Sequence, residues 1–370
     1  MKKVFLSGFD LNQSFYGEIR ILCTVKSFDL KAIRNRYLKS RFRKDGKVGS
    51  VERRQPSKGG VVEFVLRNSK VESCNVWAEI NEPRGIASSK SRLAIASDQE
   101  VYICQGEKVN VIKNDWFSYI HALDFSPHSE DHLLIASSGL DCVFEYNLSK
   151  NKIINEWYAW DSYKNRSYDS ESSSPIYLTR HAEEAKRRTD DGQKVLLISD
   201  PKNEYLPTAK RAAFINTVSY NQSDPSRFFA TLFHEGKVLD IPFSGLDREV
   251  IFENLNTPHG GFDYNDAKIA TSTSDGEVYL RRGNQTTVFS FKDLPGKNEL
   301  MQDKEWLQNS RLINNCIITI DSNRNSFVIF DPENQFYDKI EFNDNWAIQD
   351  FVYCSGLNLN LQQLKLYSFD

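Results

Sequence analysis

The sequence predicts an all-β fold made of short repeated units, and three observations support that prediction. Apolar runs such as RLAIAS, HLLIASS and KIATSTS recur along the 370 residues and are rich in residues that favour strands. Gly, Asp, Asn or Ser bounds each run, as expected for tight turns. A third observation is an internal repeat, because five similar segments precede such runs. These segments are PRGIAS (83–88), IHALDF (120–125), INTVSY (215–220), PHGGFDY (258–264) and SRLINNC (310–316).

The spacing of equivalent positions favours a propeller over a sandwich. Arg84 and His121 are 37 residues apart, Asn216 and His259 are 43 apart, and His259 and Arg311 are 52 apart. A four-stranded propeller blade takes about 40–50 residues. The segment from 120 to 158 shows one such unit, since four strand-like runs follow one another with short polar turns between them.

We therefore predict a β-propeller of four-stranded blades as a single domain over residues 1–370. Six blades are expected, with seven as the alternative, because residues 161–210 contain one more strand, KVLLISD. The terminal strands KKVFLSG and QLKLYSF are expected to share one blade, which closes the ring and removes free sheet edges. Two segments do not fit the repeat: a basic insertion at 10–58 and a polar insertion at 161–210 on one face of the disc.

Both insertions are candidate surfaces for partners. The segment 31–58 is basic and interleaved with aromatic residues, so it can bind phosphate or an acidic protein partner. A solvated loop or helical cap is the alternative for it. The segment 161–210 predicts a lid or a partner surface, or a disordered loop. The basic cluster consists of Arg34, Arg36, Lys39, Arg41, Arg43 and Lys44.

Composition narrows the class of protein. The formal net charge is −3 and 40% of the residues are hydrophobic, so neither nucleic acid nor a membrane is the expected partner. The N-terminal stretch lacks the apolar core of a signal peptide, which predicts a cytoplasmic protein. Six scattered cysteines without a CxxC pair predict buried free thiols. We expect no cofactor and no metal.

Familiar catalytic motifs are absent from the sequence, so a site has to be assembled by the repeat itself. In a propeller, the first residues of each innermost strand meet at one mouth of the central channel. This predicts a ring of Arg84, His121, Asn216, His259 and Arg311, with Gln349 as a weaker sixth member.

Guanidinium, imidazole and amide groups together predict a cationic pocket suited to a carboxylate, sulfate or phosphate. His121 and His259 are the candidate catalytic residues, as acids, bases or nucleophiles. Arg84, Asn216 and Arg311 are the candidate substrate-binding residues. The alternative is structural: such side chains can simply satisfy carbonyls in a sealed channel.

Two further residues are candidates because they precede ring positions. Arg211 lies five residues before Asn216 and can contact a bound anion from behind, with a surface position as the alternative. Trp116 precedes His121 closely enough to form a pocket wall, although packing between blades is the more common role of such a tryptophan.

The stretch HALDFSPHSEDHLLIASSGLDCVFEYNL resembles a WD-repeat blade, although the single Trp-Asp pair, Trp160-Asp161, does not recur. Over roughly residues 60–355 the pattern is also similar to six-bladed NHL, gluconolactonase or streptogramin-lyase, and arylsulfotransferase propellers. That resemblance implies an enzyme of lyase, cyclase or transferase type, acting on a small or medium-sized anionic or aromatic substrate. The alternative function is a non-catalytic propeller that binds protein partners on its faces.

Overall fold

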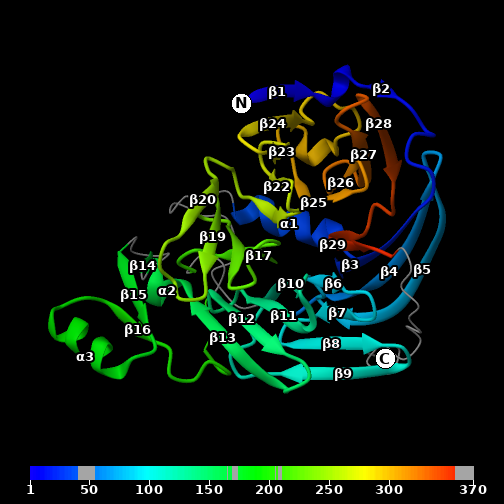
Figure 1. Ribbon diagram of the computed structural model, residues 1–370. Coiled ribbons are helices and arrows are strands. Elements are labelled where there is room, and N and C mark those ends of the chain that lie inside the picture. The colour runs from blue at the N-terminus through cyan, green and yellow to red at the C-terminus, as the bar shows by residue number, and fades with distance from the viewer. Residues whose placement is uncertain (41–54, 165, 169–173, 205, 207–210, 355–370) are drawn as a thin grey trace.

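The computed structural model describes residues 1–40, 55–164, 166–168, 174–204, 206 and 211–354. In this part of the chain, six sheets of four or five strands surround a central channel, and a seventh, three-stranded sheet lies outside the ring (Figure 1). Each innermost strand contacts the innermost strand of the next blade, and this chain of contacts returns to its start. The prediction of an all-β propeller is confirmed, with six blades.

The first three blades come mainly from the N-terminal half of the chain, and we number them from the ring closure. Written from the innermost to the outermost strand, blade 1 is β29 (Ala347–Tyr353), β3 (Ile19–Ser27), β4 (Lys58–Arg67) and β5 (Lys70–Asn81). Blade 2 is β6 (Ile86–Ser88), β7 (Leu93–Ala96), β8 (Glu100–Gln105) and β9 (Lys108–Lys113). Blade 3 is β10 (Ile120–Ser126), β11 (Ser129–Ser137), β12 (Cys142–Asn147) and β13 (Lys152–Tyr158).

The other three blades follow in chain order, and two of them gain a fifth strand. Blade 4 is β17 (Ile215–Tyr220), β18 (Arg227–Leu232), β19 (Lys237–Pro242) and β20 (Glu249–Phe252). Blade 5 is β21 (His259–Asp263), β22 (Ala267–Ser272), β23 (Glu277–Arg282) and β24 (Gln285–Ser290), with β1 (Lys2–Phe5) outside them. Blade 6 is β25 (Leu307–Ile313), β26 (Cys316–Asp321), β27 (Ser326–Asp331) and β28 (Phe336–Glu341), with β2 (Asp10–Leu11) outside them.

The ring closes in blade 1, but not through the strands predicted from the sequence. The innermost strand β29 comes from the C-terminal part of the chain and pairs antiparallel with β3. The segment KKVFLSG instead supplies β1, which pairs parallel with β24 on the rim of blade 5. The segment QLKLYSF lies outside the described residues. As predicted, strands from the two end regions of the chain pair in one blade and close the ring. These strands are β29 and β3, and the segment KKVFLSG is not one of them.

Burial on both faces of each blade explains the continuous apolar runs. In β11, Leu133 and Ile135 face blade 2, whereas Leu134 and Ala136 face blade 4. Side chains alternate between the two faces of a strand, so a blade between two neighbours needs apolar residues at every position. Across the described residues, one apolar cluster fills each of the six seams between neighbouring blades.

The N-terminal segment joins blades 5 and 6 at their rims. Between β1 and β2, a short 3-10 helix, η1 (Leu6–Gly8), places Leu6 and Phe9 in the seam between these blades. Phe9 is 6% exposed and makes edge contacts with Phe289 and Phe330 at centroid distances of 6.3 and 6.4 Å.

We expect Phe9→Ala to lower the free energy of unfolding by about 3–4 kcal/mol, because truncation leaves a cavity in a packed aromatic seam. Chemical denaturation monitored by tryptophan fluorescence measures this change. Phe5→Ala is the matched control, since Phe5 is 42% exposed, and we expect it to cost less than about 1 kcal/mol. Equal effects of the two substitutions would show that the N-terminal segment does not join the blades.

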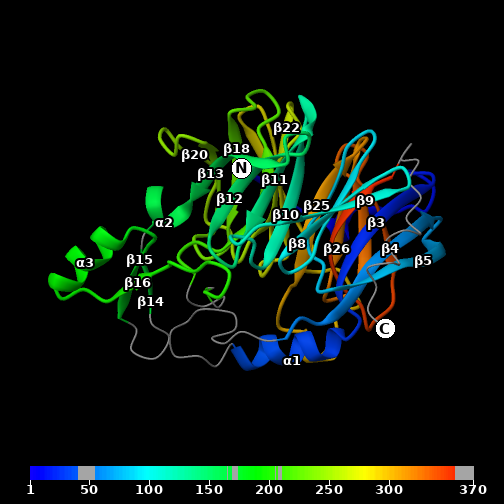
Figure 2. The same cartoon turned by 90° about the horizontal axis from the view of Figure 1, so that it is seen from below.

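The first insertion is shorter than the predicted range 10–58, because β3 within it belongs to blade 1. The remainder begins with helix α1 (Leu30–Ser40), in which Asp29 Oδ1 accepts a hydrogen bond from the Ala32 amide and caps the N-terminus. Figure 2 shows α1 lying across one face of the disc. Buried Arg34 anchors it there by donating to the carbonyls of Ser322 and Asn323. Of the predicted basic cluster, Arg41, Arg43 and Lys44 lie outside the described residues.

The second insertion projects from the side of blade 3 (Figures 1 and 2). The predicted strand KVLLISD supplies β16 of a small side sheet, so it adds no seventh blade. Outside this insertion, a further 3-10 helix, η3 (Glu299–Met301), lies between β24 of blade 5 and β25 of blade 6 in the chain. The elements of the insertion are α2 (Ala159–Ser162), β14 (Arg166–Tyr168), β15 (Pro175–Thr179), α3 (Ala182–Asp190) and β16 (Val195–Leu197).

None of the described helices has the length and apolar character needed to cross a bilayer. All six cysteines lie in the described residues as free thiols, and five of them are buried. Cys74 on β5 is the exception and is exposed, which differs from its predicted burial because its blade has no neighbour outside this outermost strand.

Candidate functional site

A cavity of about 140 Å³ opens at one mouth of the central channel. Innermost strands begin at this mouth and second strands end there, so both kinds of strand end supply side chains to it. All six blades of the described chain contribute. The lining residues are Lys26, Glu82, Arg84, Tyr119, His121, Phe214, Phe233, Thr257, His259, Thr273, Ser274, Glu305, Trp306, Gln308 and Gln349.

A repeated backbone conformation supplies four of the residues that line this pocket. Four blades place a residue with positive φ two positions before the predicted ring residue, with φ values between 44° and 55° among the described residues. L-residues rarely adopt this left-handed conformation, and a β-branched residue such as Thr257 does so at a cost. All four side chains line the pocket, so the strain recurs where it shapes the channel mouth. They are Glu82, Tyr119, Phe214 and Thr257.

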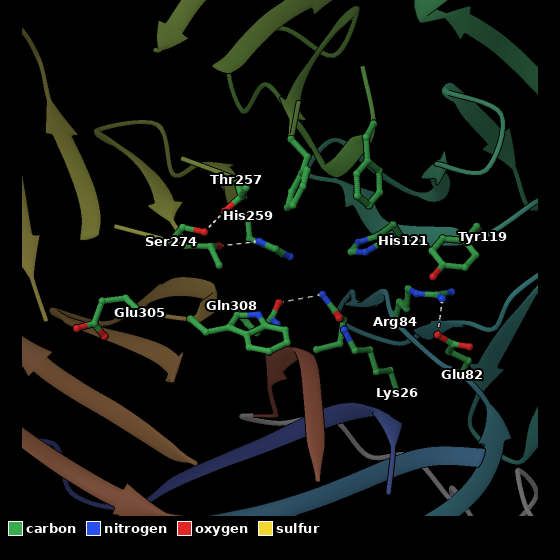
Figure 3. Close-up of a pocket in the computed structure, with 15 residues that line it drawn as sticks. Lys26, Glu82, Arg84, Tyr119, His121, Thr257, His259, Ser274, Glu305 and Gln308 are labelled. Carbon is green, nitrogen blue, oxygen red and sulfur yellow. Dashed lines mark hydrogen bonds and ion pairs between the residues drawn. The ribbon is translucent and has the colours of Figure 1, made fainter. Parts of the chain in front are cut away.

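Four rings form one wall of the pocket. His121 contacts Phe214 at a centroid distance of 5.7 Å, Phe214 contacts Phe233 at 4.8 Å, and Phe233 contacts His259 at 5.9 Å. The two imidazoles are 6.2 Å apart, and Figure 3 shows them directed towards each other across the pocket. Both imidazoles therefore lie against apolar rings and away from bulk water.

The surroundings of His121 define its protonation. Its Nδ1 lies 2.9 Å from the carbonyl oxygen of Asn216, and only a protonated Nδ1 can donate to that oxygen. Burial lowers the pKa of His121 well below its usual value, and the nearby charge of Arg84 lowers it further, with smaller effects of His259 and Lys26. The neutral imidazole thus keeps an unprotonated Nε2.

His259 is likewise neutral. Burial lowers its pKa to about 3, and the charge of Lys26 acts in the same direction. Its Nδ1 lies 2.7 Å from the hydroxyl of Thr273, which comes from the hairpin after β22. Thr257 and Ser274, whose hydroxyl oxygens are 2.5 Å apart, complete this side of the pocket.

The charge of the pocket differs from the predicted cationic ring. Arg84 Nη2 donates to Glu82 Oε1 at 2.7 Å, and Arg84 Nη1 lies 3.6 Å from Asp98 Oδ1. Arg84 thus does line the mouth as predicted, but as part of a buried ion pair. The imidazoles of His121 and His259 are neutral, and the guanidinium of Arg84 is paired with a carboxylate. The mouth is therefore not the cationic ring that the sequence predicts.

Arg311 does not reach this pocket, and the register of β25 explains the difference. Gln308, the second residue of that strand, takes the place predicted for Arg311, and Gln349 Nε2 donates to its Oε1 at 3.2 Å. Arg311 lies three residues further along, about 10 Å down the channel at the usual strand rise. There its Nη2 pairs with Asp350 at 3.1 Å. The weaker sixth candidate, Gln349, does line the pocket.

Asp124 lies in the same deeper part of the channel as Arg311 and Asp350. Burial raises its pKa to about 7, although the amide of Tyr220 donates to it at 2.8 Å. In the unfolded chain this carboxyl ionises near pH 4, so the folded state keeps the proton up to a higher pH than the unfolded state does. Stability is therefore lost as the pH rises from about 4 to about 7.

We expect Asp124→Asn to remove this loss, because the amide oxygen can still accept from Tyr220. The variant should be about 3 kcal/mol more stable than the natural protein near pH 8 and nearly equal to it near pH 4.5. Denaturant titrations at the two pH values measure the difference, with Asp115→Asn at an exposed position as the control. A stability gain that does not depend on pH would contradict the protonated carboxyl.

Asn216 is placed as predicted in its strand but does not line the pocket. It is 1% exposed, and its Nδ2 donates to the carbonyl of Pro258 at 2.9 Å. Its own backbone carbonyl accepts from His121. Asn216 thus joins blades 3, 4 and 5 through hydrogen bonds. This is the structural alternative for the ring residues, in which their side chains satisfy backbone carbonyls.

Arg211 and Trp116 also lie away from the cavity. Arg211 is buried, so the surface alternative is wrong; its guanidinium packs behind the pocket against the rings of Tyr119 and Phe214, at 4.4 and 4.6 Å. Trp116 packs against Tyr158, with ring centroids 5.1 Å apart, on the side of the second insertion. The positive φ at Tyr119 turns the chain between Trp116 and His121, so the tryptophan points away.

Several lining residues were missed because they do not occupy the ring position. Tyr119 and Phe214 lie two residues before it, and Phe233 and Ser274 follow second strands. The antiparallel order of strands in a blade could have indicated the residues that follow second strands, because a second strand ends where the innermost strand begins. Lys26 fits the same pattern, because it lies at the end of β3, the second strand of blade 1.

The described residues contain no group of three or more His, Cys, Asp or Glu side chains arranged to hold a metal ion. The pocket instead combines neutral imidazoles, amides and hydroxyls with aromatic walls.

Comparison with solved structures gives the class of protein. A nidogen/laminin complex aligns with a TM-score of 0.53 at 8% identity, covering 92% of this chain and 100% of the other. A protein of unknown function from Bacteroides caccae aligns with a TM-score of 0.50 at 9% identity, covering 90% and 98%. Streptogramin B lyase aligns with a TM-score of 0.43 at 10% identity, covering 73% and 93%.

No family model matches the sequence, and no curated protein matches it. At these identities, the likeness to solved structures shows the fold alone: the chain is a β-propeller. The finer resemblance to NHL, gluconolactonase, arylsulfotransferase or WD-repeat propellers stays an expectation from the sequence.

Proposed function

We propose that this propeller is an enzyme that binds a small organic substrate at the channel mouth and transfers a proton through His121. The observation that supports this most is the position of two neutral imidazoles, directed towards each other, in a cavity to which six blades contribute (Figure 3). Repeated backbone strain at the same mouth agrees with a functional site.

The size and walls of the cavity favour a substrate with one ring. An apolar cavity of about 150 Å³ accommodates benzene, and this one measures about 140 Å³. Phe214 and Phe233 offer apolar ring contacts on one side, while Gln308 and Gln349 offer amides on the other. A planar or aromatic ring that carries a polar substituent fits both sides.

His121 is the better placed proton acceptor. The hydrogen bond from Nδ1 to the carbonyl of Asn216 orients the ring and leaves Nε2 as the acceptor. His259 lies opposite and can hold the leaving or developing group by a hydrogen bond. A proton abstracted from the substrate by Nε2 would allow elimination or group transfer, the lyase and transferase types that the sequence resemblance implies.

The experiment is a turnover screen. Purified protein is incubated with a mixture of small aromatic and heterocyclic acids, alcohols and amides, and each compound is followed by mass spectrometry. We expect at least one compound to be consumed by the natural protein and not by His121→Asn. If no compound in a broad set changes while the protein is folded, the enzyme proposal fails and the non-catalytic propeller is favoured.

A further inference from the structure

Two buried glutamines line the pocket and have no part in the proposed proton transfer. Gln308 belongs to β25, the innermost strand of blade 6, and Gln349 to β29, the innermost strand of blade 1. Gln308 is 2% exposed and Gln349 is 1% exposed. Amides buried to this extent have lost bulk water, so they need hydrogen-bond partners inside the site.

The backbone is irregular at both glutamines. The pairing of β29 with β3 shifts its register around Gln349, and the pairing of β25 with β26 shifts around Gln308. The same kind of shift occurs around His121 in the pairing of β10 with β11. Such bulges re-aim side chains and are common beside active sites. The two glutamines therefore share with His121 a backbone feature that is typical of functional positions.

One hydrogen bond joins the two amides and leaves one group of each without a partner. Gln349 Nε2 donates to Gln308 Oε1 at 3.2 Å (Figure 3). Among the described residues, no donor reaches Gln349 Oε1 and no acceptor reaches Gln308 Nε2. A half turn of both amides exchanges the two roles, and again one carbonyl oxygen and one N–H group stay free. In either orientation this wall presents one acceptor and one donor.

An amide group supplies both of the missing partners. Its N–H donates to the free carbonyl oxygen, and its carbonyl oxygen accepts from the free N–H. A carboxylate, an ester or a ketone offers acceptors only and leaves Gln349 Oε1 without a donor. An ammonium group offers donors only and leaves Gln308 Nε2 without an acceptor. A site that is built to hydrogen-bond one group rejects analogues without it, because its own buried polar group then stays unpaired.

We propose that the substrate carries a carboxamide or a lactam on its single ring, and that Gln308 and Gln349 recognise this group. This inference rests on the proposed function, because it names the substrate class of the same pocket. The ring packs against Phe214 and Phe233, and the amide lies against the two glutamines on the other side. The glutamines thus select the substituent, while His121 accepts the proton.

The test compares benzamide with acetophenone, in which a methyl group replaces the amino group and the ring, the carbonyl and the shape are kept. Titration calorimetry on the natural protein gives both affinities. We expect benzamide to bind about tenfold or more tightly, because acetophenone leaves a buried acceptor without a donor. Burial of apolar surface alone predicts the reverse order, since methyl is the more apolar group. Equal or tighter binding of acetophenone, or no binding of either probe, would overturn the inference.

A double variant assigns the preference to the glutamines. Gln308→Met and Gln349→Met are combined, because a single remaining glutamine would still offer an N–H and a carbonyl oxygen. The double variant should bind benzamide about tenfold more weakly and acetophenone at least as tightly as before. Gln285→Met, at an exposed position at the start of β24, should change neither affinity. An unchanged preference for benzamide in the double variant would overturn the inference; if that variant does not fold, the two probes on the natural protein still decide.

The outcomes separate this inference from the proposed enzyme, because the affinities are equilibrium quantities that do not depend on turnover. Preference for benzamide without any turnover in the screen would keep the ligand class and remove the enzyme. Turnover that needs His121 but acts on a compound without an amide group would keep the enzyme and overturn the ligand class.

Discussion

His121→Asn lowers kcat/KM of the natural protein by about 100-fold or more once a substrate is in hand, because a positioned general base contributes about 10²–10⁴-fold. The asparagine amide can still donate to the carbonyl of Asn216, so the hydrogen bond that His121 Nδ1 makes is retained. What is lost is Nε2, the unprotonated nitrogen that faces His259. The loss should fall mainly on kcat, since ring contacts with Phe214 and Phe233 remain available to the substrate.

The control for this variant is His128→Asn. His128 is exposed in the turn between β10 and β11, away from the pocket, and its replacement should leave kcat/KM within about twofold. Steady-state kinetics with thermal melting of all three proteins completes the comparison. Full activity in folded His121→Asn would show that this imidazole only satisfies a carbonyl, as Asn216 does.

Arg324→Met is the substitution from which we expect the largest loss of stability, about 3–5 kcal/mol. Arg324 is fully enclosed, and Nη1 donates to Asp321 and to Glu305 at 2.7 Å each. Its other nitrogens donate to the carbonyls of Phe291 and Leu294. Methionine fills a similar volume but removes the buried cation from Asp321 and Glu305, of which Glu305 keeps its ion pair with Lys297. Because Glu305 lines the pocket, ligand affinity should fall as well.

Arg187→Met is the matched control, since Arg187 and its partner Asp191 are both largely exposed on α3. Its effect on the free energy of unfolding should be below about 0.5 kcal/mol. Urea denaturation of both variants, with the natural protein alongside, gives the two differences. A loss below about 1 kcal/mol in Arg324→Met would contradict the buried network that supports Glu305.

Most of the fold could be predicted because blade architecture repeats a pattern that every strand must satisfy. Leu133 to Ala136 are apolar without interruption, which only burial on both faces explains. Ring closure could not be predicted in detail. The segment that begins at Lys2 has the same strand pattern whether it closes a blade or extends its rim, and only its pairing with β24 distinguishes the two.

The candidate site was predictable to the extent that a residue type marks the start of an innermost strand. Arg84, His121 and His259 do so and all reach the pocket. In blade 6, Arg311 looked equivalent because it is charged, whereas the bulge after Leu307 gives the place to Gln308. A shift of three residues moves a side chain from the mouth into the depth of the channel, and sequence spacing in a degenerate repeat does not define register that finely.

Crystallography with 4-bromobenzamide tests the central claim most directly, because bromine gives an anomalous signal that locates the ligand without assumptions about its chemistry. We expect one strong peak at the channel mouth, with the ring against Phe214 and Phe233 and the polar substituent towards Gln308 and Gln349. The mouth occupied only by ordered water at saturating ligand, or a bromine peak confined to another surface, would contradict it.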